Sequence, residues 1–226
     1  MKKLLTCIMI SVFGVGILNA QGADKTLIFG AKAGVNFADI TGDEADSFDG
    51  RTSFHFGAVV EIPISEKFSF QPELLYSDQG SAYEDITSES VDGFTFTESA
   101  KGDIKLGYLN VPLMAKYYVA EGFSIEAGPQ IGLLLSAKND YSYTYTEMYT
   151  EGSFTDSESG EEDIKHSIKD IDFGVNFGVG YKLDNGLNFG ARYNLGLTDA
   201  NDDTEYLGNS SYKNSVIQVS VGYFFQ

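Results

Sequence analysis

Charged residues inside otherwise apolar segments are the first candidates for chemistry in this sequence. Glu73 lies between Pro72 and Leu74, and Arg192 lies between Ala191 and Tyr193. If these segments are β-strands, alternate side chains point to opposite faces, so the embedded polar residues share one face. This predicted set is Lys32, Glu61, Glu73, Asn110, Lys116, Glu126 and Arg192. A set with both signs either conducts protons or ions, or forms a structural network of ion pairs.

Ser53 and His55 form a second candidate, because they have the same parity in one segment. A hydroxyl beside an imidazole is the nucleophile arrangement of a lipid deacylase or acyltransferase. No carboxylate stands at a spacing that identifies it as the group orienting the imidazole. We therefore predict no catalytic residue and no enzyme activity.

A third candidate is an acidic cluster late in the chain, formed by Asp199, Asp202, Asp203 and Glu205. Carboxylates of this kind can bind Ca²⁺. The cluster lacks the ordered ligand spacing and the glycine of an EF-hand loop. We expect a solvated acidic surface, and the sequence predicts no metal site and no cofactor.

The elements that carry these residues alternate with a period of two. The segment from 170 to 183 is the clearest, since Phe173, Val175 and Phe177 alternate with glycine and asparagine. Eight such segments occur, at about 27–37, 52–62, 67–78, 103–119, 123–136, 170–183, 187–198 and 215–225. Apolar alternation of this kind fits a soluble sandwich as well as a membrane barrel with a polar interior.

The N-terminus favours export. Two lysines precede an apolar run from Leu4 to Leu18, and a small residue, Ala20, follows. This is the pattern of a secretory signal peptide, so we expect residues 1–20 to be cleaved near Ala20. The single cysteine, Cys7, lies within that segment, so the mature chain from 21 to 226 forms no disulfide.

Glycine placement and link lengths favour the membrane barrel over the sandwich. Small residues fall mostly on the non-apolar face, which suits a crowded lumen. Tight links at 63–66, 120–122 and 184–186 alternate with long links at 38–51, 79–102, 137–169 and 199–214. Short turns on one side and long loops on the other are typical of bacterial outer-membrane barrels. We predict an all-β fold, an eight-stranded antiparallel transmembrane β-barrel with up-and-down meander topology, as the only mature domain.

Charge is concentrated in the four long links, which hold 22 acidic and 6 basic residues. The formal charge of the whole chain is −18, so nucleic acid is a poor partner. Aromatic alternation continues into two of the long links, with Phe94 and Phe96 in one and Tyr141, Tyr143 and Tyr145 in the other. We expect hairpins there, with the tyrosines on the lipid-facing side of their strand. The aromatic residues either form a belt on self-packed hairpins or bind an extracellular protein partner at 79–102 and 137–169.

The segment 103–119 changes phase. Ile104 and Leu106 have one parity, whereas Leu109, Val111 and the later apolar residues have the other. A β-bulge near Gly107 would restore the register.

The strand segments also resemble a known family. Residues 108–117 read Tyr-Leu-Asn-Val-Pro-Leu-Met-Ala-Lys-Tyr, residues 190–197 read Gly-Ala-Arg-Tyr-Asn-Leu-Gly-Leu, and residues 221–225 read Val-Gly-Tyr-Phe-Phe. These segments are similar to strands of the small outer-membrane β-barrel family of Bacteroidetes called PorT-like. Asn110 stands where that family usually has glutamate. The resemblance implies an eight-stranded barrel in the outer membrane of a Gram-negative cell and little about its task.

The sequence thus predicts a barrel in outer-membrane lipid with a plugged polar lumen and a structural or interaction role at the cell surface. The alternative is a narrow transport or secretion-accessory barrel. Tyr223 and Phe225 give the chain an aromatic end. That end resembles the signal that the barrel-insertion machinery reads, and we expect it to serve as that signal.

Overall fold

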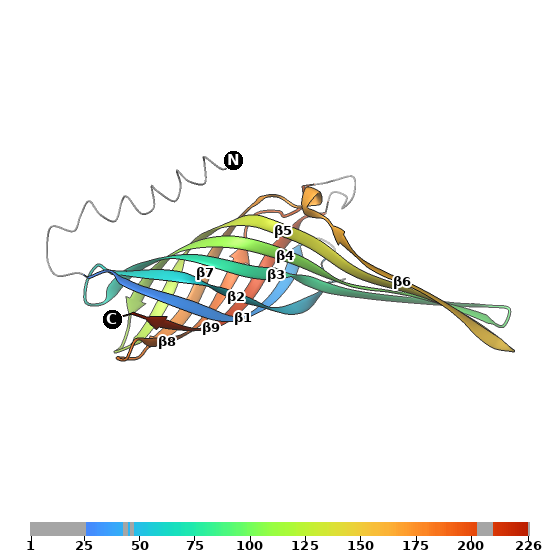
Figure 1. Cartoon of the computed structure of the whole chain (residues 1–226), viewed down its shortest axis with the longest axis horizontal. Coiled ribbons are helices and arrows are strands. Elements are labelled where there is room, and N and C mark those ends of the chain that lie inside the picture. The colour runs from blue at the N-terminus through green and yellow to red at the C-terminus, as the bar shows by residue number, and fades with distance from the viewer. Residues whose placement is uncertain (1–25, 43–44, 46–47, 203–209, 226) are drawn as a thin grey trace.

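The protein is an antiparallel β-structure (Figure 1), seen in a computed structural model that describes residues 26–42, 45, 48–202 and 210–225. The predicted signal peptide therefore lies outside the described residues. The strands are β1 Ile28–Gly42, β2 Phe48–Pro63, β3 Phe68–Val91, β4 Phe94–Tyr118, β5 Phe123–Tyr149, β6 Gly152–Asp163, β7 Ile171–Lys182, β8 Leu187–Gly196 and β9 Tyr212–Phe224, with one 3₁₀ turn, η2, at Lys165–Ser167.

Eight of these strands close into a ring. The sheet order is β4-β3-β2-β1-β9-β8-β7-β5-β6, and a further pairing between β4 and β5 closes it. The last strand of the chain pairs with the first over Gly30–Gly42 and Tyr212–Phe224. The fold class predicted from the sequence is confirmed, and the ninth strand, β6, lies outside the ring because it pairs only with the distal part of β5.

The period of two separates the two faces of the wall. On β7, Phe173 and Phe177 are about half exposed, whereas Asp172 and Asn176, each directly before one of them, are buried. The same division recurs on β9, where Ile217, Val219 and Val221 face outward while Gln218 is buried. An apolar outer wall around a polar interior is the arrangement that a lipid bilayer requires of a barrel.

Glycine is needed where neighbouring strands approach closely on the lumen side. A Cβ added at Gly57 would lie 2.0 Å from the carbonyl oxygen of Leu74, and one at Gly128 would lie 2.0 Å from that of Leu113. No side chain can be accommodated at such separations without moving a backbone.

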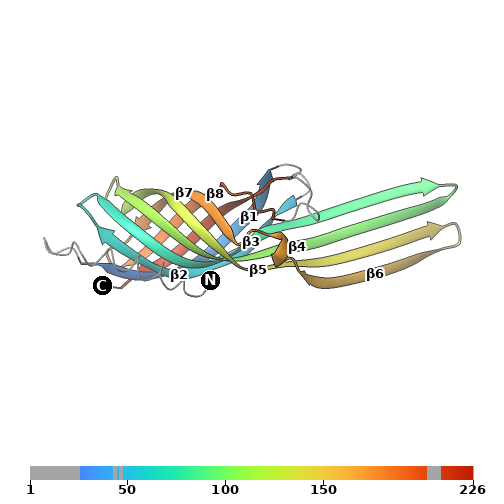
Figure 2. The same cartoon turned by 90° about the horizontal axis from the view of Figure 1, so that it is seen from above.

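Two hairpins continue far beyond one end of the ring. The β3–β4 pairing runs without interruption to Val91↔Phe94, and the β5–β6 pairing runs to Tyr149↔Gly152. The two hairpins are joined edge to edge by β4 and β5, so four strands extend side by side (Figure 2). We call residues 83–103 and 138–163 the platform. The hairpins predicted for the second and third long links are confirmed.

The register between β4 and β5 changes by one residue where the platform begins. Tyr108 pairs with Leu134, but Gly107 pairs with Ser136, which leaves Leu135 as an extra residue on β5. A bulge was predicted near Gly107 and is present in this pair, with its extra residue on the partner strand. After Leu135 the odd-numbered residues of β5 therefore change sides.

This change corrects two predictions about side-chain direction. Tyr141, Tyr143 and Tyr145 do not continue the lipid-facing side, because they lie in line with Ala137, which is buried and pairs with Leu106. Leu106 itself is 1% exposed, so the bulge does not return it to the outer wall. Both errors arise because the sequence gives the position of a phase change but not the strand that absorbs it.

Candidate functional site

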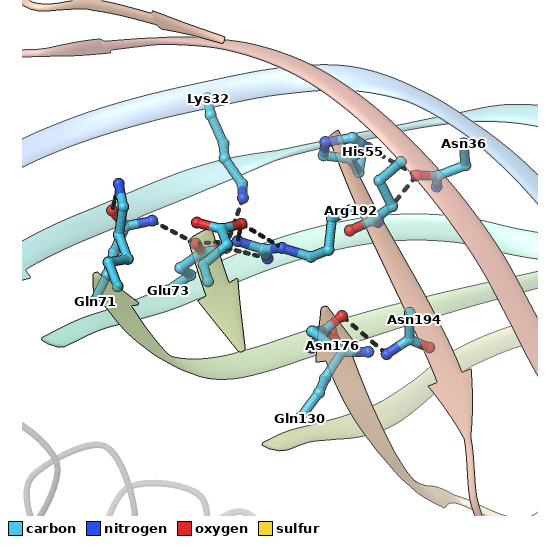
Figure 3. Close-up of polar contacts among 12 residues, drawn as sticks. Lys32, Asn36, His55, Gln71, Glu73, Gln130, Asn176, Arg192 and Asn194 are labelled. Atoms are coloured by element: carbon cyan, nitrogen blue, oxygen red, sulfur yellow. Dashed lines mark hydrogen bonds and ion pairs between the residues drawn. The ribbon is translucent and has the colours of Figure 1, made fainter. Parts of the chain in front are cut away.

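Glu73 is the centre of an ion cluster inside the barrel (Figure 3). Its carboxylate accepts two hydrogen bonds from the Arg192 guanidinium, at 2.9 and 3.0 Å. Lys32 Nζ lies 2.7 Å from the same carboxylate. The three side chains come from β3, β8 and β1, so this carboxylate connects distant parts of the wall.

Further partners extend the cluster. Arg192 also donates to Glu126 Oε1, at 2.8 Å from Nη2 and 3.0 Å from Nε. Gln71 donates to Glu73 at 2.6 Å and accepts from Lys116 at 3.1 Å. Lys32, Glu73, Glu126 and Arg192 together hold two cations and two anions, so the centre of the cluster is balanced in charge.

A separate ion pair lies nearer the short turns. Glu61, which is 1% exposed, accepts from Tyr118 Oη at 2.6 Å and from Lys182 Nζ at 3.1 Å. The sequence analysis did not include Tyr118, Lys182 or Gln71 in the set. Their parity on β4, β7 and β3 is that of the other lumen residues, so parity was the available signal.

Asn110 lies inside the barrel and pairs with Leu75, two residues beyond Glu73 along β3 toward the platform. It is 2% exposed. Within the part of the chain that the structure describes, no hydrogen bond joins its side chain to the Glu73 cluster. The structure therefore places all seven predicted residues on the lumen side, in two groups with Asn110 apart from both.

Ser53 and His55 have other partners. His55 Nδ1 lies 2.7 Å from Asn36 Oδ1, which also accepts from Gln218 at 3.0 Å. Ser53 donates to the backbone carbonyl of Asp78 at 2.5 Å. Among the described residues, no hydrogen bond joins the serine to the histidine, so the pair is not arranged as a nucleophile and its base.

The interior becomes apolar at the platform end of the ring. Leu106, Leu134 and Ala137 pack with Ile164 and Ile168 of the segment that returns from β6 to β7. Lys165 fixes that segment by donating from its ammonium to the carbonyl of Leu134 at 3.0 Å. This apolar cap consists of Leu106, Tyr108, Leu134, Ala137, Ile164, Ile168 and Ala200.

The platform has two chemically different faces. Residues paired across the strands share a face, and the face that continues the lumen side carries all eight aromatic residues of the platform. We call it the tyrosine face. Its aromatic residues are Tyr83, Phe94, Phe96, Tyr141, Tyr143, Tyr145, Tyr149 and Phe154. The opposite face is rich in serine and threonine, with cross-strand hydroxyl pairs such as Ser88–Thr97 at 3.0 Å.

Charge also differs between the faces. The opposite, hydroxyl face pairs its lysines, with Lys101 2.6 Å from Glu84 and Lys138 2.5 Å from Glu161. The hydrogen bond from Lys138 to Glu161 raises the pKa of that ammonium. The tyrosine face has no lysine or arginine on its described strands. Its acidic residues are Asp85, Glu89, Glu98, Glu147, Asp156, Glu158 and Glu162.

A shallow groove of about 330 Å³ crosses the middle of the platform. Tyr143 and Tyr145 line it together with Glu98, Asp156 and Glu158. An aromatic ring beside several carboxylates is an environment that favours cations.

The late acidic cluster is described only in part, because Asp203 and Glu205 lie outside the described residues. Asp199 accepts from the backbone N–H groups of Asn201 at 3.1 Å and Tyr212 at 2.9 Å. Burial acts to raise the pKa of Asp199, but these N–H groups hold it below its usual value. Among the described residues, no group of three or more potential ligands is placed to hold a metal ion.

Comparison with known proteins decides the family. A family model described as outer membrane protein beta-barrel domain matches residues 19–202. The chain belongs to this family. With the closed ring and its apolar outer wall, membership makes the protein an outer-membrane β-barrel.

Solved structures of other outer-membrane proteins are similar in outline. Ail, the attachment invasion locus protein of Yersinia pestis, matches with a TM-score of 0.41 and 8% identity over 88% of this chain and 98% of that chain. Neisserial surface protein A matches with a TM-score of 0.40 and 14% identity over 87% of this chain and 97% of that chain. CarO of Acinetobacter baumannii matches with a TM-score of 0.38 and 15% identity over 86% of this chain and 97% of that chain. No curated protein matches the chain. The described residues include no helix long and apolar enough to cross a membrane.

The Glu73 cluster yields the first prediction. Replacing Glu73 with glutamine leaves Lys32 and Arg192 with one fewer compensating charge in a buried site. Loss of one partner from a buried ion pair costs about 3–5 kcal/mol. We expect Glu73→Gln to lower the free energy of unfolding by that amount, measured by urea titration in lipid vesicles with the gel shift of folded barrel as readout.

Glu84→Gln is the matched control, because Glu84 lies on the same strand and pairs with Lys101 on an exposed surface. Exposed pairs contribute little, and we expect a change within about 0.5 kcal/mol. Equal losses in the two variants would contradict a structural role for the buried cluster.

Proposed function

We propose that the barrel is a closed membrane anchor that holds the platform outside the cell, where the tyrosine face binds another macromolecule. The observation that carries this proposal is the unequal distribution of side chains on the platform. All of its aromatic residues lie on one face together with seven acidic residues. A four-stranded sheet that served only as a spacer would have no need of such a division.

Three features support a closed lumen. The Glu73 cluster spans the interior from β3 to β8, with Lys32 and Arg192 on one carboxylate. Eight strands leave an interior that side chains just fill. The apolar cap adds a layer at the platform end in which the Tyr108 hydroxyl is the only polar side-chain group, so an ion would have to leave most of its water to pass it.

The orientation follows from the lengths of the connections. The links at Pro63–Phe68, Tyr118–Phe123 and Lys182–Leu187 are short and lie at the end away from the platform. In bacterial barrels the short turns are periplasmic and the long connections are extracellular. The platform is then extracellular.

An enzyme role has little support, because no hydrogen bond joins Ser53 to His55 among the described residues. The remaining alternative is narrow transport. Transport requires a continuous polar path through the lumen. The ion cluster and the apolar cap would both have to move to create that path.

Conductance separates the anchor from the transporter. Purified protein in a planar bilayer should show no steady ohmic current, because the ion pairs and the apolar cap block the lumen. The variant Glu73→Gln, which weakens the ion cluster that blocks the lumen, is the control. Steady conductance in the unmodified protein that changes in this variant would overturn the closed lumen.

Photo-crosslinking tests the binding face. We would place benzoylphenylalanine at Tyr143 on the tyrosine face or at Ser142 on the hydroxyl face, two exposed neighbours on β5. On intact cells we expect a discrete adduct from position 143 and none from 142, because the two side chains point to opposite sides of the sheet. Equal adducts from both positions, or none from either, would remove the basis for a face-specific partner.

A further inference from the structure

Beyond Tyr83, where β2 stops pairing with β3, the platform has two outer edges, and one of them is β6. This strand pairs with β5 from Lys138↔Asp163 to Tyr149↔Gly152, and within the described residues its other side has no neighbouring strand. All 12 of its residues are exposed. Figure 2 shows β6 as one of the two outer strands of the four, with β3 as the other. Its outward backbone N–H and C=O groups are therefore available to another extended chain.

The side chains of β6 alternate with the sheet. Phe154, Asp156 and Glu158 lie on the tyrosine face, whereas Ser153, Thr155, Ser157 and Ser159 lie on the hydroxyl face. A strand added beside β6 would place every second side chain next to carboxylates and the others next to hydroxyls. Alternate side chains of any strand that pairs with β6 therefore meet chemically different surfaces.

The groove adds a second recognition element at the same place. Asp156 and Glu158 form its outer side, and Tyr143 and Tyr145 form its floor on β5. An ammonium or guanidinium group in this groove gains both a carboxylate and the face of an aromatic ring. The protein itself supplies no such cation, since the described part of this face carries no lysine or arginine.

Charge excludes two other occupants of this edge. A second copy of the chain would bring β6 against β6 and place Asp156, Glu158 and Glu162 opposite like charges. A phosphate-bearing lipid surface would meet the same acidic face and be repelled. A basic polypeptide has the complementary charge and can also use the free backbone groups.

We propose that the platform binds a basic, extended segment of a partner protein, which adds as a strand to β6 with lysine or arginine at alternate positions over the tyrosine face. This inference rests on the proposed function and specifies the chemistry of the partner. Backbone pairing with β6 supplies the geometry, and the groove selects the positive charge.

A defined peptide tests the proposal. The probe is a fluorescent 12-residue peptide of alternating lysine and threonine, titrated with the full protein in lipid nanodiscs at physiological salt. Two control peptides have the same length. One is methylated on the backbone nitrogens, which blocks strand pairing, and the other replaces lysine with glutamate. We expect the first peptide to bind at least about tenfold more tightly than either control, which corresponds to one good charge contact.

Matched variants on β6 locate the site. Asp156→Asn with Glu158→Gln removes two acids from the tyrosine face, and Glu161→Gln with Asp163→Asn removes two from the hydroxyl face of the same strand. The first pair should weaken binding by about tenfold, and the second by less than about threefold. Both lose the same formal charge, so equal weakening would show general electrostatic attraction and overturn strand addition at this face. Equal affinity for the methylated peptide would overturn it as well.

Failure of this inference is distinguishable from failure of the proposed function. If Tyr143 crosslinks to a partner on cells but the lysine–threonine peptide does not bind, the platform has a partner of another chemistry and strand addition is wrong. If neither experiment gives a signal, both the interaction role and this inference are wrong.

Discussion

The strict alternation of side chains along a strand is the constraint on which this structure depends. In a closed ring every residue faces either the lipid or the lumen, so one extra residue reverses everything beyond it. Leu135 is that residue on β5. Below it, odd-numbered residues such as Ile131 face outward, and above it Tyr141, Tyr143 and Tyr145 continue the inner side. This single change places the β5 tyrosines on the same face as Tyr83, Phe94 and Phe96.

The interior follows from the same constraint. Residues that face inward cannot reach bulk water, so each buried charge needs a partner. Glu73 meets this need for Lys32 and Arg192 together, and Glu126 balances the second charge. Because these residues come from strands far apart in the sequence, the cluster connects the wall across its diameter. An anchor of this kind can hold an extended platform without the barrel changing shape.

Much of the fold is encoded locally and could be predicted. The period of two in segments such as 170–183 identifies the strands, and the short links at 120–122 and 184–186 fix the antiparallel order. The seven lumen residues were found by parity alone. Their pairing was not predictable, since it depends on distances across the ring, as the contact between Lys182 on β7 and Glu61 on β2 illustrates.

The side of the sheet on which the tyrosines lie could not be predicted from the sequence either. The phase change near Gly107 is visible in the apolar pattern, but either strand of the pair could absorb it. Only the pairing of Gly107 with Ser136 rather than Leu135 assigns the extra residue to β5. The sequence also did not indicate that the returning segment with Ile164 and Ile168 covers the mouth, because those residues lie in a stretch without periodic signal.

The register of β4 against β5 in the platform tests this account most directly. The mature sequence is predicted to lack cysteine, so pairs of introduced cysteines can report it by disulfide formation under mild oxidation. Glu98→Cys with Tyr145→Cys should crosslink, because directly paired residues lie within disulfide distance. Glu98→Cys with Thr144→Cys, the pair expected without the extra residue, should not. The reverse result would place the tyrosines on the lipid-facing side and contradict the account.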